Sequence, residues 1–309
     1  MRSPFPPDPR ILALFGPTAA GKSGLAHAVA RALDGEIVVA DPFQRYRGLE
    51  IAADSPSERD RQDVPYHFVG DLHLTETSSA GAFARAAHRR IDEILARGRV
   101  PIVAGGTGLY VRAALAELEF PTEVPEDVRR DVELLVADDL DRALAELRDR
   151  APEVADRIDA RNPRRVSRAL ELARVGAAGA PSDRLWTGVT RLPTRLVGVV
   201  RPRPVLDRLI ALRVRRELDD GLVGELGAAI DTPGVSRGAL QIIGVREVRA
   251  LRDGTMAEAS LPDALAARTR RLARAQLTWL RKTPGVSALD LGDAPAESGL
   301  TGLLGLWEG

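Results

Sequence analysis

The sequence predicts an α/β protein of the P-loop type, in which a parallel sheet is flanked by helices and interrupted by a small all-helical domain. Three observations favour this fold class. Apolar strand patterns alternate with helical patterns, a glycine-rich turn joins the first strand to the first helix, and a charged helical segment interrupts the alternation. The 309 residues are enough for one large domain that carries a smaller one.

The period of the apolar residues predicts the individual elements. We expect strands over 10–15, 36–40, 100–104 and 195–200, and helices over 22–33, 80–96, 205–220 and 263–282. The helix over 80–96 has its apolar face at Phe83, Ala87, Ile91 and Leu95. Strands that alternate with helices in this way favour a parallel sheet that is covered on both faces.

The alternation of strand and helix patterns stops between residues 121 and 192. This segment is charged and helical, and no strand pattern occurs before residue 195. We therefore predict a catalytic core built from residues 1–120 and 193–309, and a helical insertion domain over 121–192.

The composition is that of an ordinary globular protein, with 44% hydrophobic and 28% charged residues. The chain has no cysteine, which excludes disulfides, thiolate nucleophiles and cysteine-based zinc sites. No apolar run approaches the length of a membrane span, so we expect no segment to cross a membrane. We take the cytoplasm as the default compartment and expect a monomer. The net charge of zero counts against a nucleic-acid binder, although clustered arginines would outweigh it.

The strongest local signal is a phosphate-binding loop that follows the first strand and precedes the first helix. It consists of Gly16, Pro17, Thr18, Ala19, Ala20, Gly21, Lys22 and Ser23. Glycines allow the backbone N–H groups to approach an anion closely, a lysine contacts the phosphates, and the serine hydroxyl is a ligand for Mg²⁺. Lys22 is one of only two lysines in an arginine-rich chain, which suggests that a compact ammonium is required there.

Two further polar residues follow predicted strands. Asp41 comes after the second strand and Thr107 after the third, whose end carries no carboxylate. A phosphate cradle with one carboxylate suits the displacement of a diphosphate from carbon by an amine, because the carboxylate takes the amine proton. The plainer alternatives are that Asp41 caps a turn before Pro42 and that Thr107 caps the next helix.

Six motifs, in this order along the chain, resemble the tRNA dimethylallyltransferases (isopentenyl-diphosphate:tRNA transferases). The loop is similar to the family's G-P-T-A-[SG]-G-K-[ST], and Asp41–Pro56 to D-S-x-Q-x-Y-x-G-M-D-I-G-T-A-K-P. The other four are Ala104–Tyr110 for V-G-G-T-G-L-Y, Arg165–Glu171 for R-x-x-R-A-L-E, Ile243–Glu247 for I-G-Y-[KR]-E, and Thr269–Arg281 for T-R-x-x-A-K-R-Q-x-T-W-[FL]-R.

The resemblance implies transfer of a dimethylallyl group from dimethylallyl diphosphate to N6 of adenosine 37, in tRNAs that read codons beginning with U. Asp41 would be the base, Thr107 a contact of the diphosphate and the substrate, and Arg213 a diphosphate contact. The residues expected to bind the flipped adenine and the anticodon stem-loop are Asp41, Pro42, Phe43, Gln44, Thr107, Arg129, Arg164, Arg165, Arg168, Arg246, Arg270, Arg274 and Gln276. Without the resemblance, the arginine clusters would indicate solvated helix faces.

The chain departs from the family's motifs at several positions. They are Pro42 for serine, Ala52, Ala53, Asp54 and Ser55 for Gly-Thr-Ala-Lys, Asn162 for aspartate, Val245 for tyrosine, and Ala275 for arginine. Most of these changes concern the RNA side. Two other functions therefore stay open from the sequence: a P-loop kinase or phosphotransferase acting on a nucleotide or metabolite, and an RNA-binding protein without activity.

Overall fold

The computed structural model describes residues 10–120, 124–177, 185 and 187–308. The chain divides into two compact units: Met1–Leu118 with Arg184–Gly309, and Glu119–Asp183. The predicted division, at 120/121 and 192/193, differs by two residues at the first boundary and by nine at the second.

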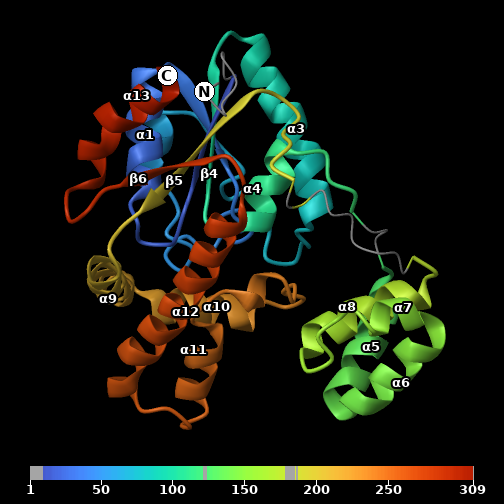
Figure 1. Cartoon of the computed structure of the whole chain (residues 1–309). Helices are drawn as coiled ribbons and strands as arrows, with labels where there is room; N and C mark the ends of the chain where they lie inside the picture. The colour runs from blue at the N-terminus through green and yellow to red at the C-terminus, as the bar shows by residue number, and fades with distance from the viewer. Residues whose placement is uncertain (1–9, 121–123, 178–184, 186, 309) are drawn as a thin grey trace. The chain divides into compact units, whose positions relative to one another are not determined.

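The large unit is built on a six-stranded parallel sheet, so the predicted fold class is confirmed (Figure 1). The strands are β1 (Ile11–Phe15), β2 (Gly35–Val39), β3 (Tyr66–His67), β4 (Val100–Gly105), β5 (Thr194–Val200) and β6 (Val286–Asp290), in the order β3-β2-β4-β1-β5-β6. All five residues of β1 and all five of β2 are buried. These uninterrupted buried runs are what a parallel sheet covered on both faces requires.

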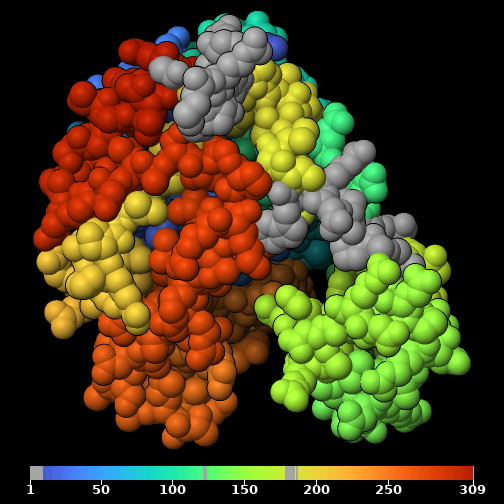
Figure 2. Space-filling model, viewed as in Figure 1, coloured from blue at the N-terminus to red at the C-terminus, as the bar shows by residue number. Residues whose placement is uncertain are grey.

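Helices cover both faces of this sheet (Figure 1). The α-helices of the large unit are α1 (Lys22–Ala32), α2 (Glu58–Asp63), α3 (Ala80–Ala96), α4 (Gly108–Leu115), α9 (Arg203–Asp219), α10 (Leu222–Asp231), α11 (Val245–Arg252), α12 (Leu261–Lys282) and α13 (Leu300–Glu308). Those that pack on the strands include α1, α3, α4 and α13. α13 packs on α1, and α3 packs on α4. The space-filling view shows the C-terminal residues, in orange and red, covering much of the blue N-terminal part on this face (Figure 2).

The structure corrects two details of the predicted elements. α3 has the predicted bounds, but Ile94 is buried and Leu95 only half-buried. With 3.6 residues per turn, Ile94 lies closer than Leu95 to the centre of the face that Phe83, Ala87 and Ile91 form. β3, β6, α2, α10, α11 and α13 were not predicted. β6 has no fully buried residue, so its sequence Val-Ser-Ala-Leu-Asp lacks the apolar run of an inner strand.

The small unit contains only helices among its described residues, as its charged sequence predicted. They are α5 (Glu126–Asp138), α6 (Leu140–Arg150), α7 (Pro152–Ala155) and α8 (Pro163–Arg174). Its own core is formed by Val132, Leu144, Leu147, Val166 and Leu170 with neighbouring alanines. The residue before α8, Asn162, accepts a hydrogen bond from Arg165 N, so this departure from aspartate keeps the helix cap.

In the part of the chain that the structure describes, every helix is too short or too polar to cross a membrane.

Close packing of α12 on α4 predicts an unusual response to a glycine substitution. A Cβ at Gly108, the first residue of α4, would lie 2.3 Å from the Trp279 ring. Gly108→Ala should therefore lower the free energy of unfolding by about 1–3 kcal/mol, although alanine is the better helix former. Thermal and urea unfolding measure the change.

Gly224→Ala in α10 is the matched control, since nothing lies within 4 Å of its Cβ position. That variant should be neutral or more stable, and equal behaviour of the two variants would contradict the packing argument.

Candidate functional site

The candidate site lies where three neighbouring strands end. β4 lies between β1 and β2, with Phe15 opposite Gly105 and Val39 opposite Ala104. The carboxyl ends of parallel strands meet at one edge of the sheet, which is where open α/β sheets bind ligands. The phosphate-binding loop, Asp41 and the turn Gly105–Thr107 are therefore brought together, as the sequence predicted.

The loop has the backbone shape of an anion cradle. Gly21 has a φ of 95° and Ala19 a φ of 62°, so the chain turns twice through the left-handed region before α1 begins at Lys22. The Lys22 ammonium folds back and donates a hydrogen bond to Pro17 O at 2.7 Å. The Arg201 guanidinium, which follows β5, donates a hydrogen bond to Ala20 O at 2.9 Å. The backbone N–H groups at the start of α1 are left to face an anion.

Two helices from the C-terminal half fasten this loop. On α12, Gln276 accepts a hydrogen bond from Thr18 N at 2.7 Å. The Gln276 amide nitrogen would lie 2.3 Å from a Cβ at Gly106, so a larger residue there would displace the Gln276 side chain. Gln276 is 5% exposed, lines the cavity and is bonded within the protein, and the RNA contact expected of it stays a prediction. We assign it a positioning role, as the link between the loop, α12 and the β4 turn.

Arg213 on α9 is the second link to the loop. Its Nη1 donates to the Thr18 hydroxyl at 2.8 Å and lies 3.0 Å from the Asp54 carboxylate. Its Nε donates to Glu217, one helical turn on, at 2.6 Å. The structure thus places Arg213 against the cradle, where the resemblance implied a diphosphate contact.

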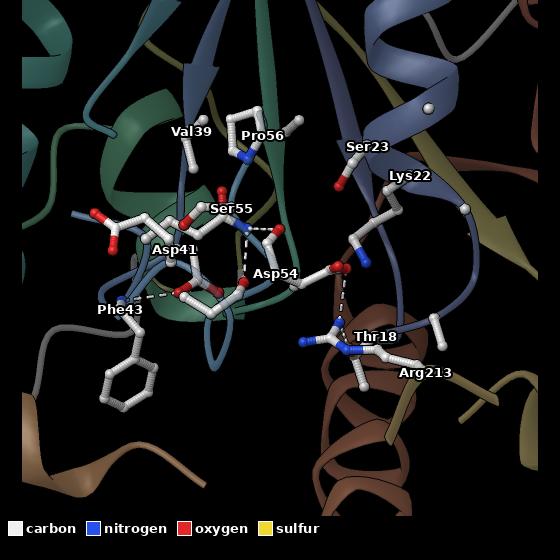
Figure 3. A pocket seen from close by; sticks show the side chains of 18 of the residues that line it. Thr18, Lys22, Ser23, Val39, Asp41, Phe43, Asp54, Ser55, Pro56 and Arg213 are labelled. Carbon is white, nitrogen blue, oxygen red and sulfur yellow. Dashed lines mark hydrogen bonds and ion pairs between the residues drawn. The ribbon is translucent and has the colours of Figure 1, made fainter. Parts of the chain in front are cut away.

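A cavity of about 1050 Å³ opens beside the loop, and Figure 3 shows part of its wall. The predicted site residues that line it are Thr18, Ala19, Gly21, Lys22, Ser23, Asp41, Phe43, Gln44, Arg213 and Gln276. Others do not reach its wall: Gly16, Pro17, Ala20, Pro42 and Thr107. In the view, Lys22, Ser23 and Arg213 lie on one side, Asp41 and Phe43 on the other, and Asp54 between them (Figure 3).

Asp41 combines a turn-capping role with a reactive one. One carboxylate oxygen accepts a hydrogen bond from Phe43 N at 2.8 Å, so the turn cap that the sequence left open is present. Burial raises the pKa of Asp41, although the N–H groups of Phe43 and Gln44 and the charge of Lys22 oppose the rise. A carboxylate with a raised pKa is a stronger base, which suits a group that takes a proton.

Thr107 is the residue before α4, yet its side chain makes no capping hydrogen bond to that helix. It is half-buried beside Gly106, which does line the cavity. The alternative that Thr107 serves only as a helix cap therefore loses its support.

Sequence reasoning missed the charged cluster around Asp54. The Asp54 carboxylate contacts Arg213 at 3.0 Å and Arg216 at 2.5 Å, and all three residues line the cavity. The sequence marked Asp54 as a departure from the family but did not indicate its partners, since they lie some 160 residues away in the chain. The spacing of Arg213 and Glu217 was a usable signal of an i,i+4 pair.

The arginines predicted to contact RNA lie on helices. On the large unit, Arg246 and Arg274 are exposed, and Arg270 lies 3.6 Å from the Asp207 carboxylate. On the small unit, Arg164 and Arg165 are exposed at the start of α8. There, Arg129 pairs with Glu126 and Arg168 pairs with Glu171. The Arg129–Glu126 pair is exposed on the Glu126 side, and such a pair is weak enough to exchange for a phosphate contact.

Comparison with known proteins identifies the family. A family model described as IPP transferase matches residues 44–283. The chain belongs to this family. The tRNA dimethylallyltransferase of Streptomyces avermitilis is 38% identical over 301 residues, which cover 95% of this chain and 96% of that protein. That of Thermobifida fusca is also 38% identical, over 92% of this chain and 91% of that protein.

Solved structures agree with this membership of the IPP transferase family. The tRNA isopentenylpyrophosphate transferase of Bacillus halodurans superposes with a TM-score of 0.71 at 28% identity, covering 97% of each chain. A eukaryotic dimethylallyltransferase acting on tRNA gives a TM-score of 0.72 at 22% identity, over 92% of this chain and 74% of that one. The second likeness concerns the fold alone.

The electrostatics of the cradle predict how anion binding depends on pH. Burial, followed by the charge of Arg213, lowers the pKa of Lys22 from 10.5 to about 8. Because the ammonium loses its proton above this value, affinity for inorganic pyrophosphate should fall as the pH rises through about 8. Calorimetric titration across this range measures the effect.

Lys22→Met is the control for this prediction, since its side chain has a similar length and carries no charge at any pH. Ionisation of the ligand is common to both proteins, so the ratio of their affinities isolates the titration of Lys22. A ratio that does not change between pH 7 and about 9.5 would contradict the lowered pKa.

Proposed function

We propose that this protein transfers a dimethylallyl group from dimethylallyl diphosphate to N6 of adenosine 37, in tRNAs that read codons beginning with U. The observation that carries the proposal is the meeting of Asp41 and the Lys22 cradle in one cavity of a chain that belongs to the IPP transferase family. The relatives named above, which align over almost the whole chain, support tRNA and the dimethylallyl donor as substrates.

The residues suggest how each part of the reaction is served. The adenine N6 attacks C1 of the prenyl group, a new C–N bond forms, and the C–O bond to the diphosphate breaks. Asp41 accepts the proton that the amine loses. Lys22, Arg213 and the N–H groups at the start of α1 stabilise the charge on the departing diphosphate. The Thr107 hydroxyl follows the neighbouring strand beside Gly106, which lines the cavity, and its contact with the diphosphate and the substrate is what the resemblance to the family implies.

Mg²⁺ fits this arrangement as a companion of the diphosphate. Among the described residues there is no group of three or more carboxylate or histidine side chains that could hold an ion alone. Mg²⁺ in phosphate sites is held by few protein ligands together with phosphate oxygens, and the Ser23 hydroxyl at the start of α1 lines the cavity. The ion would neutralise charge on the leaving diphosphate.

The RNA would be held in two ways. Phe43 and Gln44 line the cavity beside Asp41, next to Pro42, and are placed to contact an adenine turned out of the anticodon loop. The arginines on α8, α11 and α12, with Arg129, would contact the phosphates of the anticodon stem-loop. That the protein acts as a cytoplasmic monomer stays a prediction.

Transfer of radiolabel from dimethylallyl diphosphate to unmodified tRNA, with Mg²⁺ and without ATP, tests the proposal. Label in tRNA that disappears when adenosine 37 is replaced would support it. A kinase or phosphotransferase would instead consume ATP, and family membership does not favour that alternative. Binding of tRNA without any label transfer would point to an inactive RNA-binding protein and overturn the proposal.

Asp41→Asn should separate chemistry from binding. The amide oxygen can still accept the hydrogen bond from Phe43 N, so the turn stays, but the base is lost. We expect kcat for transfer to fall by about 10²–10⁴, with the tRNA Kd within about twofold of wild type. Single-turnover transfer and filter binding measure the two quantities. A near-normal kcat would remove Asp41 as the base.

A further inference from the structure

The cradle contains more negative charge than an anion site needs. Arg213 contacts two carboxylates, Asp54 at 3.0 Å and Glu217 at 2.6 Å, and Asp54 also contacts Arg216 at 2.5 Å. Two arginines are therefore matched by two protein carboxylates before any ligand enters. A diphosphate placed at the loop would meet guanidiniums that are already paired with carboxylates, and the negative charge of Asp54 would repel it.

The two carboxylates are held very differently. Glu217 belongs to the same helix as Arg213, and its side chain is 11% exposed. Asp54 sits on a loop in the left-handed region, with a φ of 52°, and its side chain is 36% exposed. Of the two, Asp54 is the one that can withdraw, while Glu217 keeps Arg213 aimed at Thr18.

The rest of the loop is fixed, so the movement is confined to one side chain. The N–H groups of Ile51 and Ala52 donate to the Glu225 carboxylate at 2.9 and 2.8 Å. The Gln44 amide donates to Ala53 O at 3.2 Å. The backbone on the N-terminal side of Asp54 is thus anchored to α10 and to the residues that follow β2.

We propose that Asp54 is an internal counter-anion: its carboxylate occupies Arg213 and Arg216 in the empty site and gives them up when the diphosphate binds. This inference rests on the proposed function, in which a diphosphate is both part of the donor and the product. It makes Asp54 a residue that weakens diphosphate binding. The same competition promotes release of pyrophosphate after transfer, because Asp54 pairs again with the vacated arginines.

Titration of inorganic pyrophosphate, at fixed Mg²⁺ and ionic strength, tests the inference. Asp54→Asn should bind pyrophosphate about tenfold more tightly than wild type, because one repelling charge is removed close to the ligand. Asp54→Glu keeps the charge and should stay within about threefold of wild type. In the transfer assay, pyrophosphate should inhibit Asp54→Asn at correspondingly lower concentration.

Glu50→Gln is the matched control. Glu50 lies on the same loop and lines the same cavity, but its carboxylate accepts hydrogen bonds from Gly48 N instead of pairing with an arginine. If charge alone mattered, this variant would tighten pyrophosphate binding as much as Asp54→Asn, and the inference would be overturned. It would also be overturned if Asp54→Asn bound pyrophosphate no more tightly than wild type, or less tightly after loss of thermal stability, as a purely structural ion pair would.

The outcomes separate this inference from the proposed function. Tighter pyrophosphate binding by Asp54→Asn, together with no transfer of label to tRNA by wild type, would support the counter-anion and overturn the prenyl transfer. Transfer of label by wild type, together with an unchanged pyrophosphate affinity of Asp54→Asn, would support the prenyl transfer and overturn the counter-anion. If neither wild type nor Asp54→Asn bound pyrophosphate, the cradle would not be a diphosphate site and both would fall.

Discussion

The position of β4 between β1 and β2 is the constraint on which the site depends. Sequence neighbours β1 and β2 are separated by a strand that comes some 60 residues later, so three different loops leave the sheet side by side. One loop supplies backbone N–H groups and an ammonium, one a carboxylate, and one a glycine turn with a hydroxyl. The C-terminal helices then close on this edge through Gln276 and Arg213, which both contact Thr18.

Bringing these groups together out of water has an electrostatic consequence. Burial raises the pKa of Asp41 and lowers that of Lys22, so each group is moved toward its neutral form. The shift makes Asp41 a better base, but it weakens Lys22 as an anion ligand at alkaline pH. The arginines compensate because a guanidinium stays charged where an ammonium does not. A buried site that must take both a proton and an anion thus needs two kinds of cation.

Much of this site could be predicted because its parts are local. The loop from Gly16 to Ser23 is a continuous pattern, and Asp41 and Thr107 each follow a recognisable strand. The sequence did not indicate the contacts that join distant segments of the chain. The arginines around Gln276 in the sequence suggest an exposed helix face. The packing of α12 instead buries Gln276 against Thr18. The sequence also gives no sign that Arg213 pairs with Asp54, because the two residues are far apart in the chain. β6 was not predicted because it lacks a buried apolar run.

The single lysine of the cradle illustrates why residue type matters more there than charge. Lys22 donates a hydrogen bond to Pro17 O within its own loop at 2.7 Å. Because this partner is a neutral carbonyl, the ammonium can leave it without breaking an ion pair. A compact ammonium can turn from that carbonyl to a phosphate oxygen by side-chain rotation alone. Arg213 has no such freedom, since Glu217, Thr18 and Asp54 each take part of its planar fork. The division of labour follows from this geometry: the lysine exchanges a neutral partner for the ligand, whereas the arginine must exchange one anion for another.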